Sequence, residues 1–131
     1  MSHSPQHLLL RNQINAIIAN AYERLERIAS FDHRQACRIV SLIMQYCCAA
    51  QHVGGITAGR NAFKQLPADW VSKHLSEIID ESVNLADAWE YRRLLELLNE
   101  SNRDLLQAYV TEGLKSKDPE ITEAARDFAN H

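Results

Sequence analysis

The chain has 131 residues, of which 46% are apolar and 24% are charged, and it contains only four glycines and three prolines. This balance is typical of one globular domain and excludes a disordered chain. Residues 1–64 carry seven basic and three acidic side chains, a net +4, whereas residues 65–131 carry seven basic and fourteen acidic ones, a net −7, which together give −3. An acidic half disfavours nucleic acid as a partner and favours a basic protein, although solvated helix faces also lean to one sign without any function.

We expect neither a membrane-spanning helix nor a signal peptide in this sequence. No apolar run approaches the roughly 20 residues that a membrane-spanning helix needs. The leucines at 8–10 are followed at once by Arg11, and this segment is too short for the core of a signal peptide. An odd number of cysteines fits reduced thiols. We therefore expect a cytoplasmic protein with no membrane partner.

The first two predicted elements are long helices with continuous apolar faces. Between residues 10 and 28, apolar residues recur at steps of three and four, which predicts one helix over 5–30. The stripe is too short for the several heptads of a coiled coil with a second chain, so we expect it to pack on its own chain. A second helix is expected over 33–52, with Asp32 as its N-cap and the glycine pair 54–55 as its stop. Its predicted buried positions are Ala36, Ile39, Val40, Ile43, Met44 and Cys47.

Two further helices are expected next, a short one in the segment 56–64 that is entered at Thr57, and a longer one that Leu66 and Pro67 open. Gly59 and the pair 54–55 do not form a phosphate-binding loop, because no strand precedes them and no Lys-Ser or Lys-Thr pair follows. We interpret these glycines as a helix stop and a close packing point. His74 falls among apolar positions, which predicts a buried, hydrogen-bonded histidine. The inward positions of this fourth helix are Trp70, Val71, Leu75, Ile78 and Ile79, and the outward ones are Asp69, Lys73, Glu77 and Asp80.

The stretch 87–128 predicts three short amphipathic helices with tight connections. Asp87 and Glu90, three residues apart, form a capping-box pattern at the start of the first of them. A tight connection at 99–102 leads to the second helix. The segment 118–120, Asp-Pro-Glu, is a strong start for the third, because it offers an N-cap, a proline at the first helical position and an acid in the first turn.

Trp89 falls on the charged face of its predicted helix, where it is flanked by Arg93, Glu96 and Glu100. One interpretation is that a neighbouring helix covers the ring. The other is that the ring anchors a binding partner, since Trp and Arg are frequent among the residues that dominate binding energy. The sequence leaves both interpretations open.

A metal site is not expected. His33, Cys37, Cys48 and His52 project along one strip of the predicted helix 33–52. The strip spans nineteen residues, or roughly 28 Å at a rise of about 1.5 Å per residue, whereas zinc ligands lie about 2.0–2.3 Å from the ion. The four side chains cannot share one metal ion while the helix is continuous.

Two helix pairs joined by very short turns are typical of an α-solenoid of the HEAT-like kind. The segment 89–95, Trp-Glu-Tyr-Arg-Arg-Leu-Leu, continues through Leu114, Ser116, 118–121 and the apolar residues Ala124, Ala125 and Phe128. This pattern resembles a repeat of small bacterial proteins, some of which are similar to immunity proteins that neutralise polymorphic or contact-dependent toxins. Because such proteins work by surface complementarity, the resemblance implies no active-site residues.

The fold that we expect is all-α. It is a single domain over 1–131, built as a right-handed stack of about six to seven antiparallel helices, either HEAT-like or an irregular helical bundle. A long helix pair is expected in 1–55, and short helical hairpins are expected in 56–131.

The function that we expect is non-catalytic protein binding, most concretely as an immunity protein that docks an acidic face on a basic bacterial toxin. We expect no cofactor. The absence of a Walker, Rossmann, Gly-x-Ser-x-Gly or His-Glu-x-x-His pattern supports this expectation. The candidate contact residues are Glu77, Asp80, Asp87, Trp89, Glu96 and Glu100.

Two alternatives belong to other classes of function. The segment 126–131, Arg-Asp-Phe-Ala-Asn-His, resembles the Arg-polar-x3-His motif of HEPN ribonucleases, in which the Arg and the His would act on RNA. Against this alternative stands the acidic half of the chain, which would repel RNA. The other alternative is a structural protein that self-associates as a homodimer through the first helix or an exposed end of the stack.

Overall fold

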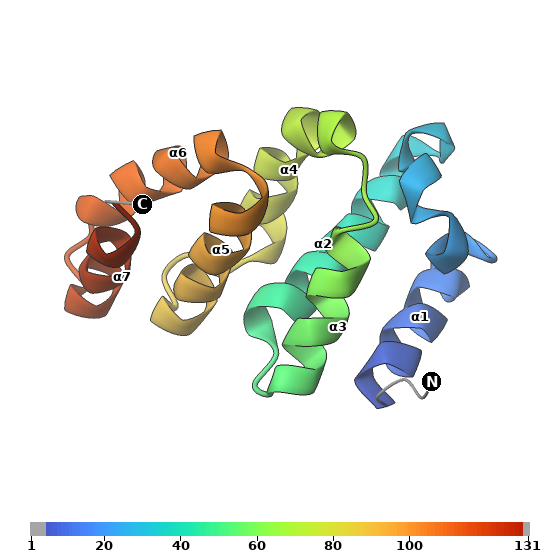
Figure 1. Cartoon of the computed structure of the whole chain (residues 1–131), viewed down its shortest axis with the longest axis horizontal. Coiled ribbons are helices and arrows are strands. Elements are labelled where there is room, and N and C mark those ends of the chain that lie inside the picture. The colour runs from blue at the N-terminus through green and yellow to red at the C-terminus, as the bar shows by residue number, and fades with distance from the viewer. Residues whose placement is uncertain (1–4, 130–131) are drawn as a thin grey trace. The chain divides into compact units, whose positions relative to one another are not determined.

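The computed structural model describes residues 5–129, which form seven α-helices and one 3-10 helix and contain no strand. The prediction of an all-α fold is thereby confirmed. None of these helices is both long and apolar enough to cross a membrane. In chain order they are α1 (Pro5–Ile17), η1 (Ala21–Ser30), α2 (His33–Ala49), α3 (Val53–Phe63), α4 (Ala68–Ser82), α5 (Ala88–Ser101), α6 (Arg103–Leu114) and α7 (Pro119–Ala129) (Figure 1).

The chain divides into two compact units, an N-terminal unit over 1–82 and a C-terminal unit over 83–131. Because α3 packs against α1 and α2, it belongs to the N-terminal unit. The single domain and the right-handed HEAT-like stack stay predictions.

In the N-terminal unit, α2 is the central helix, and it contacts α1, η1, α3 and α4 (Figure 1). The predicted N-cap is confirmed, since a side-chain oxygen of Asp32 accepts a hydrogen bond from the backbone N–H of Gln35 at 3.1 Å. The predicted buried face is also confirmed, with Cys48 added to it.

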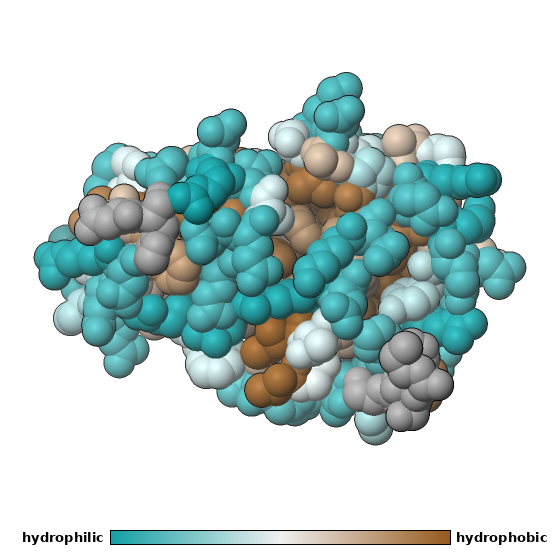
Figure 2. Space-filling model, in the orientation of Figure 1, coloured by the Kyte–Doolittle hydropathy of each residue, from teal (hydrophilic) through white to brown (hydrophobic). Residues whose placement is uncertain are grey.

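Hydrophilic residues cover most of the face of the molecule drawn in Figure 2, and hydrophobic residues reach that surface only in small patches.

The prediction of one continuous helix over 5–30 is wrong. The α-helix ends at Ile17, and Asn20 adopts the left-handed conformation, with φ 63° and ψ 16°. Asparagine accepts this conformation more readily than most residues because its short polar side chain forms local hydrogen bonds. The turn is also fixed from outside, since the Asn15 side chain accepts a hydrogen bond from the N–H of Tyr22 at 2.9 Å. The apolar spacing survives the break, so η1 still buries Ala21, Leu25 and Ile28.

The glycine pair 54–55 does not stop α2, as the sequence had suggested. The helix already ends at Ala49, and both glycines lie in the first turn of α3. The N-cap of α3 is His52, whose Nδ1 accepts a hydrogen bond from the N–H of Gly55 at 3.3 Å. The interpretation of close packing is confirmed for Gly59. A Cβ atom there would lie 2.7 Å from the backbone nitrogen of Cys47 in α2.

The C-terminal unit consists of three helices, α5, α6 and α7, each of which contacts the other two. The predicted tight connection between α5 and α6 is a single residue, Asn102. Its backbone N–H donates to the carbonyl of Leu98 at 2.8 Å, and its side chain accepts from the N–H of Leu105 at 3.1 Å. The same residue therefore ends one helix and begins the next. The buried side chains of the three helices are Tyr91, Leu94, Leu95, Leu97, Leu98, Leu106, Tyr109, Val110, Ile121, Ala124 and Ala125.

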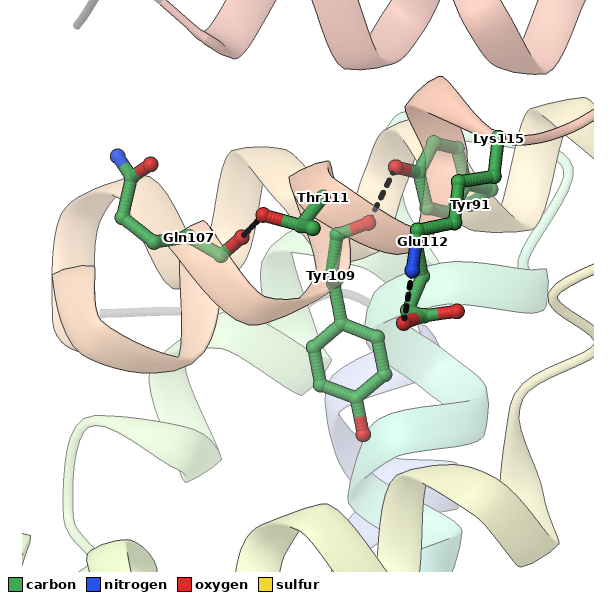
Figure 3. A network of polar contacts seen from close by, with 6 residues as sticks. All are labelled: Tyr91, Gln107, Tyr109, Thr111, Glu112 and Lys115. Carbon is green, nitrogen blue, oxygen red and sulfur yellow. Dashed lines mark hydrogen bonds and ion pairs between the residues drawn. The ribbon is translucent and has the colours of Figure 1, made fainter.

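A buried hydroxyl joins α5 to α6. Figure 3 shows the Tyr91 hydroxyl donating to the backbone carbonyl of Tyr109, at 2.7 Å. Only 2% of Tyr91 is exposed, and burial raises the pKa of its phenol to about 12. The contact depends on Gly113 in α6, because a Cβ atom at that position would collide with the Tyr91 hydroxyl.

The buried phenol makes stability depend on alkaline pH. An unfolded Tyr91 loses its proton near its ordinary pKa of 10, whereas the folded residue holds it until about pH 12. Between pH 10 and pH 12 the Tyr91 phenol ionises in the unfolded chain but not in the folded one, and this ionisation stabilises the unfolded chain. We therefore expect the free energy of unfolding to fall as the pH rises from 10 to 12. Two pKa units correspond to at most about 2.7 kcal/mol.

Urea denaturation across this pH range measures the effect, and Tyr91→Phe is the control. The variant should be less stable at neutral pH, because it loses the hydrogen bond to Tyr109, but its stability should fall less steeply above pH 10. Burial also raises the pKa of Tyr22, Tyr46 and the thiols of Cys37 and Cys47, so these residues supply a background slope in both proteins. Equal slopes in the two proteins would contradict the prediction.

Candidate functional site

The clearest candidate for a binding residue is Trp89, which is 41% exposed at the start of α5. The guanidinium carbon of Arg93 lies 4.6 Å from the centre of the Trp89 ring, one turn further along the same helix. Arg93 in turn pairs with Glu96 at 3.0 Å. The ring is therefore held from one side by its own helix, while much of its surface stays open to solvent.

Trp89 lies in a shallow groove between α5 and α7 with a volume of about 310 Å³. An ion pair of 2.9 Å between Arg92 of α5 and Asp127 of α7 ties the two helices together. The groove thus combines an aromatic surface with carboxylates on the opposite helix. We call it the Trp89 groove, and the residues that line it are Ala88, Trp89, Arg92, Arg93, Glu120 and Glu123.

The six candidate contact residues lie on both units. Two of them, Glu77 and Asp80, belong to α4 in the N-terminal unit. The other four belong to the C-terminal unit, where Asp87 is the N-cap of α5 and the helix itself contains Trp89, Glu96 and Glu100. The structure brings Glu96 to Trp89 through Arg93. Glu100 is eleven residues from Trp89, or roughly 16 Å along the helix axis. The predicted N-cap is confirmed for Asp87, which accepts hydrogen bonds from the N–H groups of Trp89 and Glu90 at 2.9 and 3.2 Å.

Glu120 and Glu123 of α7 line the Trp89 groove, but the sequence did not single them out as contacts. Both are acidic residues near the start of a predicted helix, which ordinarily indicates nothing beyond a favourable interaction with the helix dipole. Only the packing of α7 beside α5 places them next to Trp89. No local pattern in the sequence carries that information.

The acidic half of the sequence is shared between the units. Residues 83–131 carry ten acidic and six basic side chains, a net −4, and residues 1–82 carry seven acidic and eight basic ones, a net +1. The four acids of α4 therefore belong to a unit that is nearly neutral. The acidic character is concentrated in the C-terminal unit, which also carries Trp89.

A second groove lies between α2 and α4 in the N-terminal unit and has a volume of about 660 Å³. Cys37 lies in it, with its Sγ 3.5 Å from Nε2 of His33. Partial burial and the carboxylates of Glu77 and Glu81 raise the pKa of the Cys37 thiol. The raised pKa favours the protonated thiol, which is a weaker nucleophile than the thiolate. We call this feature the α2–α4 groove.

His74 is half-buried rather than buried, and it takes part in a row of rings. Its ring centre lies 4.7 Å from that of Trp70 on the same helix and 4.9 Å from that of His33 on α2. The prediction of a buried histidine is therefore wrong, because the His74 side chain is only partly buried. These ring contacts help to join α4 to α2.

The four candidate metal ligands do not share one helix. His33, Cys37 and Cys48 lie on α2, but the chain leaves that helix at Ala50, and His52 caps α3. Among residues 5–129, no three His, Cys, Asp or Glu side chains are placed to hold a metal ion.

The ribonuclease motif can be followed only in part. Arg126 is an exposed residue of α7, whereas His131 lies outside the described residues. The pairing of these two side chains stays a prediction.

No protein-family model matches the chain, and no curated protein or solved structure matches it significantly. Its function has to be inferred from its own residues. The resemblance to HEAT-like repeats and to immunity proteins stays a prediction.

Proposed function

We propose that the chain is a non-catalytic protein-binding module of the immunity type, which docks on a basic toxin domain and blocks its activity. The observation that carries the proposal is the exposed Trp89 ring in a groove that Glu120 and Glu123 line on the side of α7. Tryptophan is over-represented among the residues that contribute most to binding energy, and it does so best where neighbouring groups exclude water.

Charge supports the same surface. The Trp89 groove lies on the unit with a net charge of −4, and Glu120 and Glu123 line it. The two arginines that also line it are paired with acids, Arg92 with Asp127 and Arg93 with Glu96. A basic partner would be attracted over a distance by this charge and then anchored by the ring. Electrostatic attraction of this kind raises the rate of association more than it slows dissociation. Removing the acids and removing the ring are therefore expected to affect different rate constants.

The test begins with affinity capture of the chain from its own cells, followed by measurement of the binding constant for the captured protein. We expect Trp89→Ala to weaken binding at least tenfold, mainly through faster dissociation. Leu114→Ala is a matched control, because Leu114 is similarly exposed, at 45%, but lies on α6 and does not line the groove. An inhibition assay of the captured protein's own activity shows whether binding is neutralising.

A double reversal, Glu120→Lys with Glu123→Lys, is expected to slow association at low salt and to have little effect at high salt. If Trp89→Ala and Leu114→Ala bind equally well, the Trp89 groove is not the binding surface. If no partner is captured and light scattering shows a dimer, self-association replaces the proposal.

A further inference from the structure

The α2–α4 groove of the N-terminal unit has walls of opposite charge. Arg34 and Arg38 of α2 form one wall, and Glu77 and Glu81 of α4 form the other. All four side chains are exposed, and none of them forms an ion pair or hydrogen bond with another residue in the range 5–129. The two walls therefore present unpaired charge toward whatever occupies the groove.

The groove also has an apolar component and a definite length. Ile17, Leu42 and Ile78 lie among its lining residues. Along α2 the lining extends from His33 to Gln45, which is twelve residues or roughly 18 Å, a little more than three turns of a helix. An amphipathic helix docks by placing an apolar stripe of residues spaced by three and four in such a groove. The charges on either side then decide which helices fit.

We propose that the α2–α4 groove binds an amphipathic helix of a partner protein, with acidic residues along one edge of its apolar stripe and basic residues along the other. The acidic edge would lie against Arg34 and Arg38, and the basic edge against Glu77 and Glu81. Turning a helix end to end exchanges its two edges, so this charge pattern accepts the partner helix in one direction only. The groove lies on the other unit from Trp89 and does not depend on the function proposed for that residue.

The test uses three labelled synthetic helices that share one apolar stripe and differ only in their edges. One has an acidic and a basic edge, the second has two acidic edges, and the third has two basic edges. Fluorescence anisotropy with the full chain is expected to show the mixed helix binding at least about tenfold more tightly than either of the others.

Charge reversal of one wall supplies the sharper readout. Arg34→Glu with Arg38→Glu is expected to move the preference to the helix with two basic edges. Glu77→Lys with Glu81→Lys is expected to move it to the helix with two acidic edges. Both double variants change exposed residues, and circular dichroism checks that they fold. The change of preference itself cannot come from a loss of structure.

Two results of the binding experiments would overturn the proposal, and one result for the chain alone would do the same. One is that the mixed helix does not bind, or binds no better than the other two. The other is that the wall variants keep the order of preference of the parent chain, which would mean that binding occurs elsewhere. Sedimentation of the chain alone shows whether a second copy occupies the groove, and a dimer that the wall variants abolish would also overturn the proposal.

Discussion

Gly59→Ala is expected to lower the free energy of unfolding by about 3 kcal/mol, at the upper end of the usual cost of overpacking a core. The added Cβ would lie 2.7 Å from the backbone nitrogen of Cys47, 2.9 Å from Cβ of Tyr46 and 3.0 Å from Sγ of Cys47. The nearest of these atoms belongs to the backbone of α2 and cannot rotate away. The helices α2 and α3 would have to separate, which would loosen the central packing of the N-terminal unit.

Gly54→Ala is the matched control, because it makes the same chemical change five residues earlier in the same helix. Its Cβ would meet Oε1 of Gln6 at 2.8 Å, which is the far end of a flexible side chain. Alanine is favoured over glycine within a helix by about 1 kcal/mol, so this variant should be neutral or slightly more stable. Urea denaturation followed by circular dichroism compares the two. Equal midpoints would show that Gly59 does not set the distance between α2 and α3.

Gly113→Ala is expected to cost a similar amount, about 3 kcal/mol, in the C-terminal unit. The new Cβ would occupy the place of the Tyr91 hydroxyl, and it would also lie 3.1 Å from Cβ of Ala125 in α7. The buried Tyr91 ring has little room to move, and moving it would break the hydrogen bond to the carbonyl of Tyr109. The variant should therefore loosen all three helices of the unit.

A double-mutant cycle identifies the cause. Tyr91→Leu removes the hydroxyl and the far end of the ring, so Gly113→Ala should cost markedly less in that background than in the parent chain. Thermal and urea denaturation of the four proteins give the coupling energy. If the two costs simply add, the sensitivity of Gly113 does not come from Tyr91.

The features that the sequence predicted well are local. Asp32 and Asp87 were identified as N-caps because a cap needs only a suitable side chain two or three residues before the backbone N–H group from which it accepts a hydrogen bond. Both make that contact in the structure. The apolar faces of α2 and α4 were also predicted, because the spacing of apolar residues along the sequence indicates which side of a helix is buried.

The features that were missed depend on competing local signals or on packing between distant segments. The break at Asn20 leaves the apolar spacing intact, so periodicity cannot detect it. The start of α3 was placed too late because His52 is an uncommon cap and glycines usually end helices. Of the Trp89 groove, the sequence predicted only the part that α5 supplies, which includes Trp89. It did not predict Glu120 and Glu123, because they belong to α7, some thirty residues away in the sequence.

The single-residue connection at Asn102 has a consequence for how fast the C-terminal unit forms. Closing a loop costs chain entropy that grows with its length, and here almost no loop has to be closed between α5 and α6. The third helix follows after four residues, so the contacts of α6 with α5 and with α7 join segments close in sequence, and those between α5 and α7 join segments about thirty residues apart. Chains dominated by such short-range contacts cross a small entropic barrier and fold in microseconds to milliseconds. The unit that carries Trp89 is therefore built to regain its structure quickly after any transient opening.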